Sequence, residues 1–329
     1  MARWIFDLSS RRLSHVFQAG ENPAHAPVFF SRSKRIALWG NRIEGGEMTR
    51  ILPRSILIVV KRGHGEALRL AEEIAGWLAE RGLDVHVTEN EDDISSCLPR
   101  RSPTLTLVLG GDGTMISVAR KICANDMAVL GINFARVGFL TECPRDVWQE
   151  VLREILEQGA VVSTRLLLDV RLIRDDAEML SAIAVNDIVV GRSNLARLIN
   201  LELFFATERI AALRADGLIF STPTGASAYS YSAGGPLIYP ELQVICATPI
   251  CSFLTEIKPF IFPADQLIGV RVDEDTTEAF LTLDGQSGWP LCKGDLVQVT
   301  MSSRFLHLVR YPGSSYFQKL KAKGFLRDS

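Results

Sequence analysis

The chain has 329 residues, which at about 150 residues per domain corresponds to about two domains and excludes a small disulfide-stapled fold. Lysine and arginine total 36 against 38 aspartate and glutamate residues, a net charge of −2, so the strongly basic surface of a general nucleic-acid binder is excluded. The composition, 47% hydrophobic and 22% charged, is that of a globular protein rather than a disordered one.

Neither a membrane span nor a metal-cysteine site is expected. The longest apolar runs are short, such as residues 56–60, and lie far below the roughly 20 residues that span a bilayer. The six cysteines form no CxxC pair and have no histidines at zinc-ligand spacing. We interpret them as buried free thiols of a reducing compartment and expect a cytoplasmic protein with no membrane partner.

Residues 1–53 fit no periodic pattern, because Gly, Pro, Ser and Arg interrupt each candidate element. Arginines with few acids would suit a transit peptide, but no amphipathic pattern is sustained. We predict an extension outside the main fold that is either poorly ordered or upstream of the true start, since Met48 lies just before the first clear strand.

Strands and helices alternate over residues 54–160. Strands are predicted at 56–60, 83–87, 105–109 and 128–132, with a short acidic helix or loop at 90–98. The helices are predicted after the glycine turn at 63–65, over 114–124 and over 145–157. This order indicates a parallel, Rossmann-like sheet, which binds ligands at the carboxyl ends of its strands.

Residues 161–305 contain long runs rich in Val, Ile, Leu and Phe instead. The runs cover 161–173, 182–190, 199–205, 213–221, 267–272, 279–283 and 296–301. We predict a mainly β, sandwich-like domain with one helix after Pro223, and a carboxyl-terminal segment, 306–329, that returns to the α/β domain. The predicted fold class is α/β plus mainly β.

The densest chemical signal is Gly110-Gly111-Asp112-Gly113-Thr114, directly after a buried strand. Glycines let backbone N–H groups approach a phosphate, and a following helix N-terminus adds partial positive charge. A carboxylate there would repel phosphate unless it binds Mg²⁺, takes a proton from an attacking hydroxyl or binds a sugar hydroxyl. The alternative is that Asp112 is a turn residue and Thr114 a helix cap.

Residues 110–114 resemble the signature of a kinase superfamily that includes NAD kinases, lipid kinases and, with Ser for Thr, phosphofructokinases. Residues 186–187, followed by an apolar run, and the segment 215–236, ADGLIFSTPTGASAYSYSAGGP, resemble the NAD kinases in order and spacing. With matches at 131–133, 137–140 and 284–286, the resemblance covers residues 54–312. It implies transfer of the terminal phosphoryl group of ATP or polyphosphate, with Mg²⁺ or another divalent metal, to the adenosine 2′-hydroxyl of NAD, giving NADP.

The resemblance also implies which residues act. Asp112 would be the general base, while Asn186 and Asp187 would contact the adenosine ribose. The NAD-binding residues it implies are Asp112, Gly113, Phe139, Asn186, Asp187, Arg197, Arg214, Asp216, Ser227, Ala228, Tyr229, Ser230, Tyr231, Ser232 and Gln286. The donor phosphates would contact Gly110, Gly111, Gly113 and Thr114. From their place in the first glycine turn, Arg62 and His64 are further candidates for the donor phosphates, although a lone histidine in a loop is usually just exposed. No fixed protein ligand is assigned to the metal.

Several of these residues also have a purely structural interpretation. A hydrated strand end would account for residues 186–187, a Ser/Thr-rich loop for 221–232, and a hairpin turn for 284–285. Isolated arginines such as Arg197 and Arg214 are most often solvated surface residues.

The chain departs from the family at Ala226 and Ser227, where relatives carry Ser-Thr, and near Ser252 and Lys258, where they carry His and Arg. Ser227 keeps the hydroxyl, whereas contacts that relatives make with the His and Arg near Ser252 and Lys258 are not transferred to this chain. The family's segment around Asp216 can reach a neighbouring subunit, which implies a homodimer or homotetramer.

Two rival functions remain open, a lipid kinase and a non-catalytic pyridine-nucleotide sensor. The segment 215–236 disfavours the first, and the intact motif at 110–114 disfavours the second. The expected partners are NAD and ATP as small-molecule substrates, without nucleic acid.

Overall fold

The computed structural model describes residues 5–7, 12–14, 43–45, 48–90, 94, 104–125, 127–134, 138–193, 197–253, 257–273, 276, 279–311 and 314–326. The chain divides into two compact units, Met1–Leu38 and Trp39–Ser329. In the first, β1 (Ile5–Asp7) and β2 (Arg12–Ser14) form an antiparallel pair. All that follows concerns the second unit. Most of the acidic segment predicted at 90–98 lies outside the described residues.

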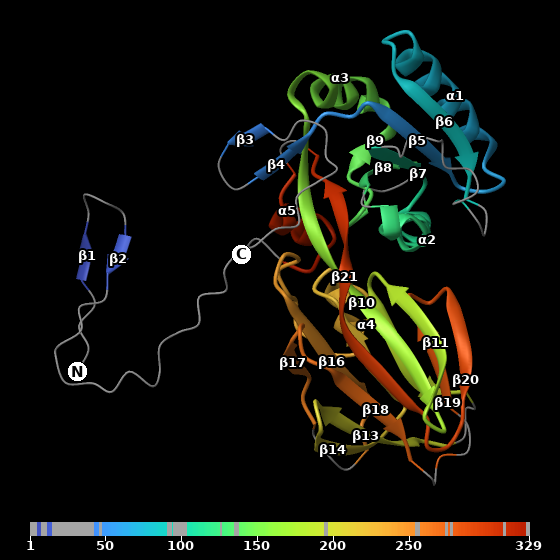
Figure 1. The fold of residues 1–329 in the computed structure, drawn as a ribbon, viewed down its shortest axis with the longest axis vertical. Coiled ribbons are helices and arrows are strands. Elements are labelled where there is room, and N and C mark those ends of the chain that lie inside the picture. The colour runs from blue at the N-terminus through green and yellow to red at the C-terminus, as the bar shows by residue number, and fades with distance from the viewer. Residues whose placement is uncertain are drawn as a thin grey trace. The chain divides into compact units, whose positions relative to one another are not determined.

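The first lobe of this unit is a parallel sheet with helices on both faces (Figure 1). Its strands are β5 (Ser55–Val60), β6 (Asp84–Glu89), β7 (Leu105–Leu109) and β8 (Ala128–Asn133), in the order β8-β7-β5-β6, and β9 (Cys143–Pro144) pairs with β8. Helices α1 (Gly65–Ala79) and α3 (Trp148–Gln158) pack on the face that contains Ile58 and Leu107. Helix α2 (Asp112–Ile122) packs on the opposite face, against Leu57 and Val108. The predicted Rossmann-like lobe is confirmed.

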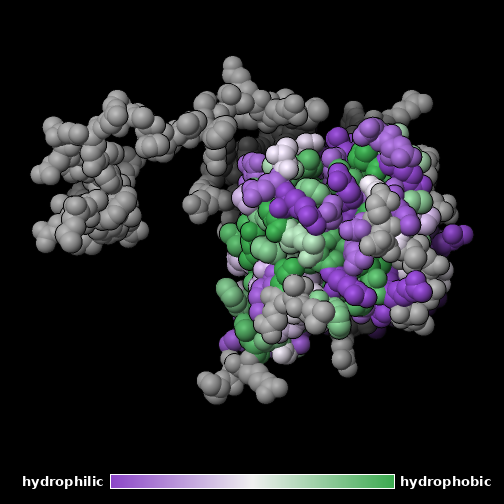
Figure 2. All heavy atoms as spheres, turned by 90° about the horizontal axis from the view of Figure 1, so that it is seen from below, coloured by the Kyte–Doolittle hydropathy of each residue, from purple (hydrophilic) through white to green (hydrophobic). Residues whose placement is uncertain are grey.

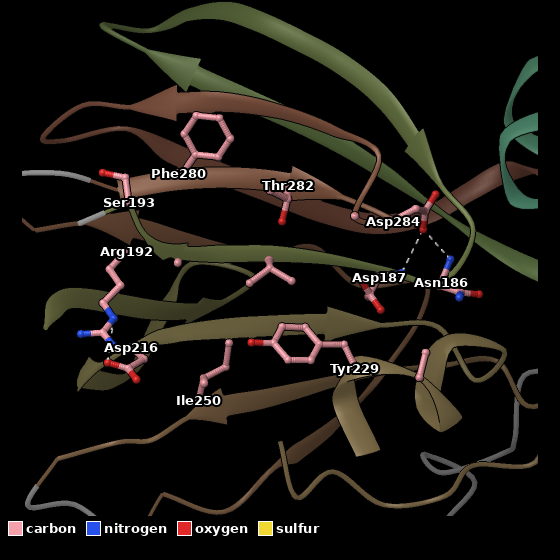
Figure 3. A pocket seen from close by; sticks show the side chains of 14 residues that line it. Asn186, Asp187, Arg192, Ser193, Asp216, Tyr229, Ile250, Phe280, Thr282 and Asp284 are labelled. Carbon is pink, nitrogen blue, oxygen red and sulfur yellow. Dashed lines mark hydrogen bonds and ion pairs between the residues drawn. The ribbon is translucent and has the colours of Figure 1, made fainter. Parts of the chain in front are cut away.

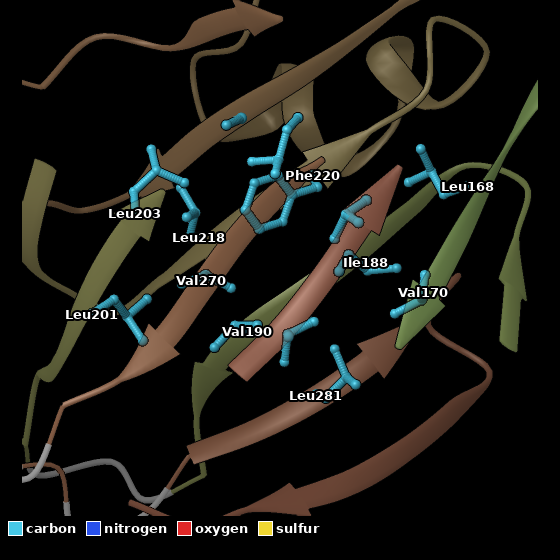
Figure 4. Packing of buried hydrophobic residues seen from close by; sticks show 14 of the residues in the cluster. Leu168, Val170, Ile188, Val190, Leu201, Leu203, Leu218, Phe220, Val270 and Leu281 are labelled. Atoms are coloured by element: carbon cyan, nitrogen blue, oxygen red, sulfur yellow. The ribbon is translucent and has the colours of Figure 1, made fainter. Parts of the chain in front are cut away.

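The second lobe is a sandwich of antiparallel sheets. One sheet has the order β17 (Phe260–Pro263), β16 (Val244–Ile250), β15 (Gly217–Ser221), β12 (Asp187–Arg192), β19 (Ala279–Leu283) and β20 (Ser287–Leu291). The facing strands are β10 (Ala160–Arg174), β11 (Ala177–Ala184), β13 (Ile199–Phe205), β14 (Glu208–Ala215), β18 (Ile268–Val272) and β21 (Leu296–Val309). Side chains from both sheets, Phe220 and Val270 among them, form one core (Figure 4). The predicted sandwich-like lobe is therefore also confirmed.

Two long strands, β10 and β21, run through both lobes (Figure 1). They pair antiparallel from Val162↔Val309 to Ile173↔Leu296, and the end of β21 pairs in parallel with β8 at His307↔Ala128 and Leu308↔Val129. The two lobes therefore share one sheet, to which thirteen strands of the described residues belong. The domain boundary expected between 305 and 306 falls inside β21, which is followed by the short helix α5 (Tyr316–Ala322).

The expected extension, 1–53, includes residues that take part in the fold. Strands β3 (Ile43–Gly45) and β4 (Met48–Ile51) form a hairpin, and β4 pairs with β10 at Ile51↔Ala160. Ile51 is buried in the core of the parallel lobe. Strands of three or four residues are too short to show a period in the sequence, so the hydrophobic pattern does not predict them.

Two apolar runs predicted as single strands are each divided. Residues 182–190 become β11 and β12, separated at 185–186, and residues 213–221 become β14 and β15, separated at Asp216. Each run crosses from one sheet of the sandwich to the other. Both sheets bury side chains in the same core, so the apolar pattern continues across the break and hides it.

Some predicted details differ at the ends of elements and at the cysteines. Helix α2 begins at Asp112 with Gly111 as its N-cap, so Thr114 lies inside the helix and is not a cap. The helix predicted after Pro223 is reduced to the 3₁₀ turn Gly225–Ser227 and the single turn α4 (Tyr229–Ser232). Cys251 and Cys292 are exposed, contrary to the expectation of buried thiols.

The surface carries both polar and apolar side chains, as the face in Figure 2 shows. Four exposed apolar side chains lie on or near the edge strand β17: Phe260 and Ile261 belong to it, Leu242 lies shortly before its neighbour β16, and Leu267 lies between β17 and β18. No helix in the described part of the chain is both long enough and apolar enough to cross a membrane.

Candidate active site

A pocket of about 800 Å³ lies against the six-stranded sheet of the sandwich (Figure 3). Val189 and Gly191 line it, whereas the alternate residues Ile188 and Val190 of the same strand lie in the core. The pocket therefore occupies the face of the sheet that is turned away from the core. Its lining residues are Asn186, Asp187, Val189, Gly191, Arg192, Ser193, Asp216, Ala228, Tyr229, Ile250, Phe280, Thr282, Asp284 and Gly285.

Asp284 organises one end of this pocket. Its carboxylate, which has no exposed surface, accepts hydrogen bonds from the backbone N–H groups of Val185 (3.0 and 3.1 Å), Asn186 (2.7 Å) and Asp187 (3.1 Å). Asp284 lies in the β19–β20 turn with φ of 51°, a conformation in which Asp and Asn are enriched. The turn thereby fixes the three residues where the chain passes from β11 to β12.

The two neighbouring carboxyl groups have raised pKa values. Burial, and secondly the negative charge of Asp284, raise the pKa of Asp187 to about 7. Burial also raises the pKa of Asp284, although its three backbone donors and Arg120, 3.7 Å away, act in the opposite direction. Asp187 therefore exchanges its proton near neutral pH at the wall of a pocket, a property typical of functional sites.

Four buried polar side-chain atoms have no hydrogen-bond partner among the described residues, and three of them, Asn186 Oδ1, Ser221 Oγ and Thr224 Oγ1, belong to segments beside Asp187. The fourth is Arg165 Nε. The turn that carries Thr224 lies tightly against the crossover, because a Cβ on Gly225 would lie 2.1 Å from the carbonyl oxygen of Asn186. Most buried polar atoms in folded proteins are paired, so three unpaired ones next to a pocket indicate hydrogen-bonding capacity kept for a ligand.

The opposite end of the pocket carries an ion pair. Arg192 Nε lies 3.1 Å from Asp216 Oδ1, and both side chains are partly exposed. Between this pair and Asp187 lies the ring of Tyr229, which is 48% exposed (Figure 3). The pocket thus offers hydrogen-bonding groups at both ends and an aromatic side chain between them.

Asp112 lies outside the pocket lining and is anchored to a turn of the parallel lobe. Its Oδ1 accepts from Leu140 N (3.2 Å), Thr141 N (3.0 Å) and Thr141 Oγ1 (2.9 Å), and its Oδ2 accepts from Phe139 N (2.8 Å). The contact is close, because a Cβ on Gly138 would lie 1.9 Å from Oδ1. The carboxylate is therefore held in one orientation by the turn at 138–141.

A polar link joins the helix of Asp112 to the pocket. Arg120 of α2 donates to Gln286 Oε1 (3.0 Å) and to Ser287 Oγ (3.4 Å), and Gln286 Nε2 donates to the carbonyl of Gly113 (2.8 Å). These residues connect α2 to the turn that carries Asp284. Gln286, a predicted pocket residue, therefore lies at the junction of the lobes.

The predicted site residues take three kinds of position. Five of them line the pocket: Asn186, Asp187, Asp216, Ala228 and Tyr229. Two aromatic ones, Phe139 and Tyr231, contact Phe325 at ring-centroid distances of 5.6 and 4.7 Å. The residues of the glycine motif, Gly110, Gly111, Gly113 and Thr114, lie with Asp112 at the start of α2. Of the serines in the long motif, Ser227 is half-buried and Ser232 is exposed.

Other predicted residues face elsewhere. Ser230 is fully buried and its hydroxyl pairs with Thr248 (2.8 Å), so it is directed into the fold and not into the pocket. Arg197 is exposed, and so is Arg214, whose guanidinium lies over the ring of Phe253. In the first glycine turn, Arg62 is exposed.

His64 has a structural role in the same turn. Its Nδ1 accepts the N–H of Ala67 (3.2 Å) and caps α1. That ring nitrogen is therefore not available to a phosphate group while the cap is formed.

Sequence reasoning missed Asp284, Arg120 and Arg192. The Asp-Gly pair was recognised as a turn, but a turn preference does not reveal that the carboxylate binds a segment about a hundred residues earlier. Nothing in the sequence distinguishes Arg120 or Arg192 from other cations on polar faces.

Comparison with known proteins gives consistent matches along the chain. Residues 96–160 match the ATP-NAD kinase N-terminal domain, and residues 185–311 match the ATP-NAD kinase C-terminal domain. An NAD kinase of Nitratidesulfovibrio vulgaris is 46% identical over 276 residues, which cover 84% of this chain and 98% of the relative. An NAD kinase of Oleidesulfovibrio alaskensis is 44% identical over 277 residues, 84% of this chain and 94% of the relative.

Solved structures share the fold at lower identity. A yeast NADH kinase complexed with NADH has a TM-score of 0.75 at 22% identity and covers 88% of this chain and 94% of its own. An NAD kinase from Archaeoglobus fulgidus in complex with ATP has a TM-score of 0.64 at 23% identity and covers 82% of this chain and 98% of its own.

Proposed function

The chain belongs to the NAD kinase family, a family of phosphotransferases, and from this premise we propose that it transfers the terminal phosphoryl group of ATP to the adenosine 2′-hydroxyl of NAD, giving NADP. The observation that carries the proposal is the group of unpaired buried atoms, led by Asn186 Oδ1, beside Asp187 in a pocket of about 800 Å³. Ribose hydroxyls both donate and accept hydrogen bonds, so they suit an amide oxygen next to a carboxyl group.

Asp112 is the proposed general base. Each carboxylate oxygen has about two lone-pair positions. Three donors of the 138–141 turn share those of Oδ1, whereas Oδ2 accepts one donor. The remaining position on Oδ2 can accept the proton of the attacking hydroxyl. The turn fixes the direction of that position, and catalysis of phosphoryl transfer depends mainly on such positioning.

A divalent metal is proposed to arrive with the donor nucleotide. No group of three or more His, Cys, Asp or Glu side chains that could hold a metal occurs within the described residues. Mg²⁺ commonly binds substrate phosphates with only one or two carboxylates and keeps several waters. The donor set of this chain therefore fits a metal carried by ATP better than a resident ion, and Mg²⁺ would neutralise phosphate charge there.

The direct test is NADP formation from NAD, ATP and Mg²⁺ by the purified chain, detected with an NADP-specific dehydrogenase. Asp112→Asn is expected to lower kcat by a factor of about 10² to 10⁴, the usual effect of a general base, with NAD binding largely kept. Thr164→Val, a surface change remote from the pocket, is the matched control. Parental turnover in Asp112→Asn would refute the assignment of the base, whereas phosphorylation of diacylglycerol or a sphingoid base instead of NAD would refute the function itself.

The same assay defines the donor and the acceptor. Replacing ATP with polyphosphate tests the donor, and replacing NAD with NADH tests the acceptor. We propose ATP and NAD, since the matched family models are those of ATP-NAD kinase.

We also propose that the chain forms a homodimer or homotetramer through the edge strand β17. Phe260 and Ile261 of this strand, with Leu242 and Leu267, expose between 37% and 54% of their surfaces. Ile261→Lys is expected to lower the mass measured by analytical ultracentrifugation, and a monomeric parent chain would refute the proposal.

A further inference from the structure

Lys319 of the carboxyl-terminal helix α5 reaches the turn that holds Asp112. Its side chain is only 12% exposed, and its ammonium donates to the carbonyl oxygen of Phe139 (3.2 Å) and to a carboxylate oxygen of Glu142. The other oxygen of Glu142 accepts the N–H of Tyr311 at 3.3 Å. The lysine therefore belongs to a buried, paired network and not to the solvated face of α5.

One peptide group lies between the ammonium and the Asp112 carboxylate. The oxygen of the Phe139–Leu140 peptide accepts from Lys319, and the N–H of the same peptide donates to Asp112 Oδ1 at 3.2 Å. Hydrogen bonds on the two ends of one peptide group polarise each other and strengthen together. A cation on the oxygen thus stabilises the orientation in which the N–H points at the carboxylate.

The residues after α5 support the same turn from another side. Phe325 packs edge-on against Phe139, with ring centroids 5.6 Å apart, and Lys323 Nζ lies 5.3 Å from the centre of the Phe139 ring. Phe325 also contacts Tyr231 of the sandwich lobe. The end of the chain is therefore packed between the turn that anchors Asp112 and a residue of the long motif.

We propose that Lys319 is a positioning residue for phosphoryl transfer, acting through the Phe139–Leu140 peptide on the orientation of Asp112. This inference rests on the proposed kinase function. It predicts that removing the ammonium lowers kcat but leaves the affinity for NAD nearly unchanged, because Lys319 does not line the pocket. A small displacement of a catalytic group can lower turnover by up to about 100-fold, so we expect a decrease of about 10-fold to 100-fold.

The experiment compares Lys319→Met with Lys319→Arg and with Lys321→Met, which removes the same charge from the exposed side of α5. Turnover is measured in the NADP assay and NAD affinity by calorimetry. Lys319→Met should lose turnover, Lys319→Arg should recover most of it, and Lys321→Met should match the parent. Since Lys319→Met leaves the Glu142 charge buried and unpaired, the double variant Lys319→Met/Glu142→Gln is measured as well and replaces it if the single variant does not fold.

A double-mutant cycle with Asp112→Asn distinguishes positioning from general stability. If Lys319 acts through Asp112, then Lys319→Met should change the residual rate of Asp112→Asn by less than about 2-fold. Equal fold-losses in both backgrounds, or parental kcat in Lys319→Met and in Lys319→Met/Glu142→Gln, would overturn the inference. Absence of NADP formation by the parent chain would instead refute the proposed function.

Discussion

Replacing Asp187 with asparagine is expected to stabilise the fold at alkaline pH. Burial and the charge of Asp284 raise the pKa of Asp187 from an ordinary value of 3.8 to about 7. Between these two values the folded chain keeps a proton that the unfolded chain has released, so the free energy of unfolding falls as pH rises. The contribution of this bound proton to the free energy of unfolding is complete below pH 3.8 and is lost above about pH 7.

The size of the effect follows from the same two values. At about 1.4 kcal/mol for each pH unit, the interval from 3.8 to about 7 corresponds to about 4 kcal/mol. Because the Asp187 residue is only 6% exposed, solvent screening reduces this little. Asparagine has nearly the same shape and no charge to bury, and the backbone N–H of residue 187 can still donate to Asp284. Its advantage over aspartate should grow by about 2 to 3 kcal/mol between about pH 5 and about pH 8.5.

Urea denaturation followed by tryptophan fluorescence at both pH values measures this advantage. Asp216→Asn is the matched control, because Asp216 also lines the pocket but is partly exposed and paired with Arg192. An advantage for Asp187→Asn that is equal at the two pH values would refute the argument. If Asp187 contacts the ribose as proposed, the same variant should bind NAD less well, because the carboxylate that destabilises the fold is then also a substrate contact.

Three further changes test the geometry of the site and the core. Gly138→Ala places a Cβ 1.9 Å from Asp112 Oδ1 and must displace the turn. It should therefore lower kcat in the NADP assay by about 100-fold. Turnover within a few-fold of the parent would contradict the anchoring of Asp112. Asp284→Ala leaves three buried backbone N–H groups without their acceptor. It should lower the free energy of unfolding by about 3 kcal/mol or more in urea titrations. Asp284→Asn keeps an acceptor oxygen, so it should lower the free energy of unfolding clearly less. Phe220→Ala removes a side chain with no exposed surface from the centre of the sandwich, and should cost about 3 to 5 kcal/mol in the same titrations; a smaller loss would show that the neighbouring side chains collapse into the space.

The parallel lobe was the part of the fold most accessible from sequence. In α1 the apolar residues Ala67, Ala71, Ile74 and Leu78 repeat at helical spacing and are the ones that become buried. The sandwich was recognised as β-rich, but its connections were not, because β11 and β12 bury side chains in one core from opposite sheets. Periodicity reports that a side chain is buried and not which sheet carries it.

The candidate site also contains residues that the sequence predicted and residues that it did not. Asn186, Asp187, Asp216 and Tyr229 were identified through motif resemblance and line one pocket. Asp284 and Lys319 were missed because their partners lie roughly a hundred or more residues away in sequence. Contacts of that kind follow from tertiary structure, and local pattern carries no signal for them.

The position of β21 within the shared sheet has a consequence for how the chain is made. This strand is the last of the sheet to leave the ribosome, yet its neighbours are β10, β18 and β8, which belong to both lobes. Until it is synthesised, β18 lacks a partner along one edge, Ala128 and Val129 of β8 lack theirs, and the cores of both lobes lack the side chains that β21 contributes. The sheet that joins the two lobes is therefore complete only when nearly the whole chain has been made, so we expect folding to be slow and largely post-translational. A chain that stops before β21 should remain aggregation-prone and open to proteolysis, which links completion of synthesis to the appearance of a working enzyme.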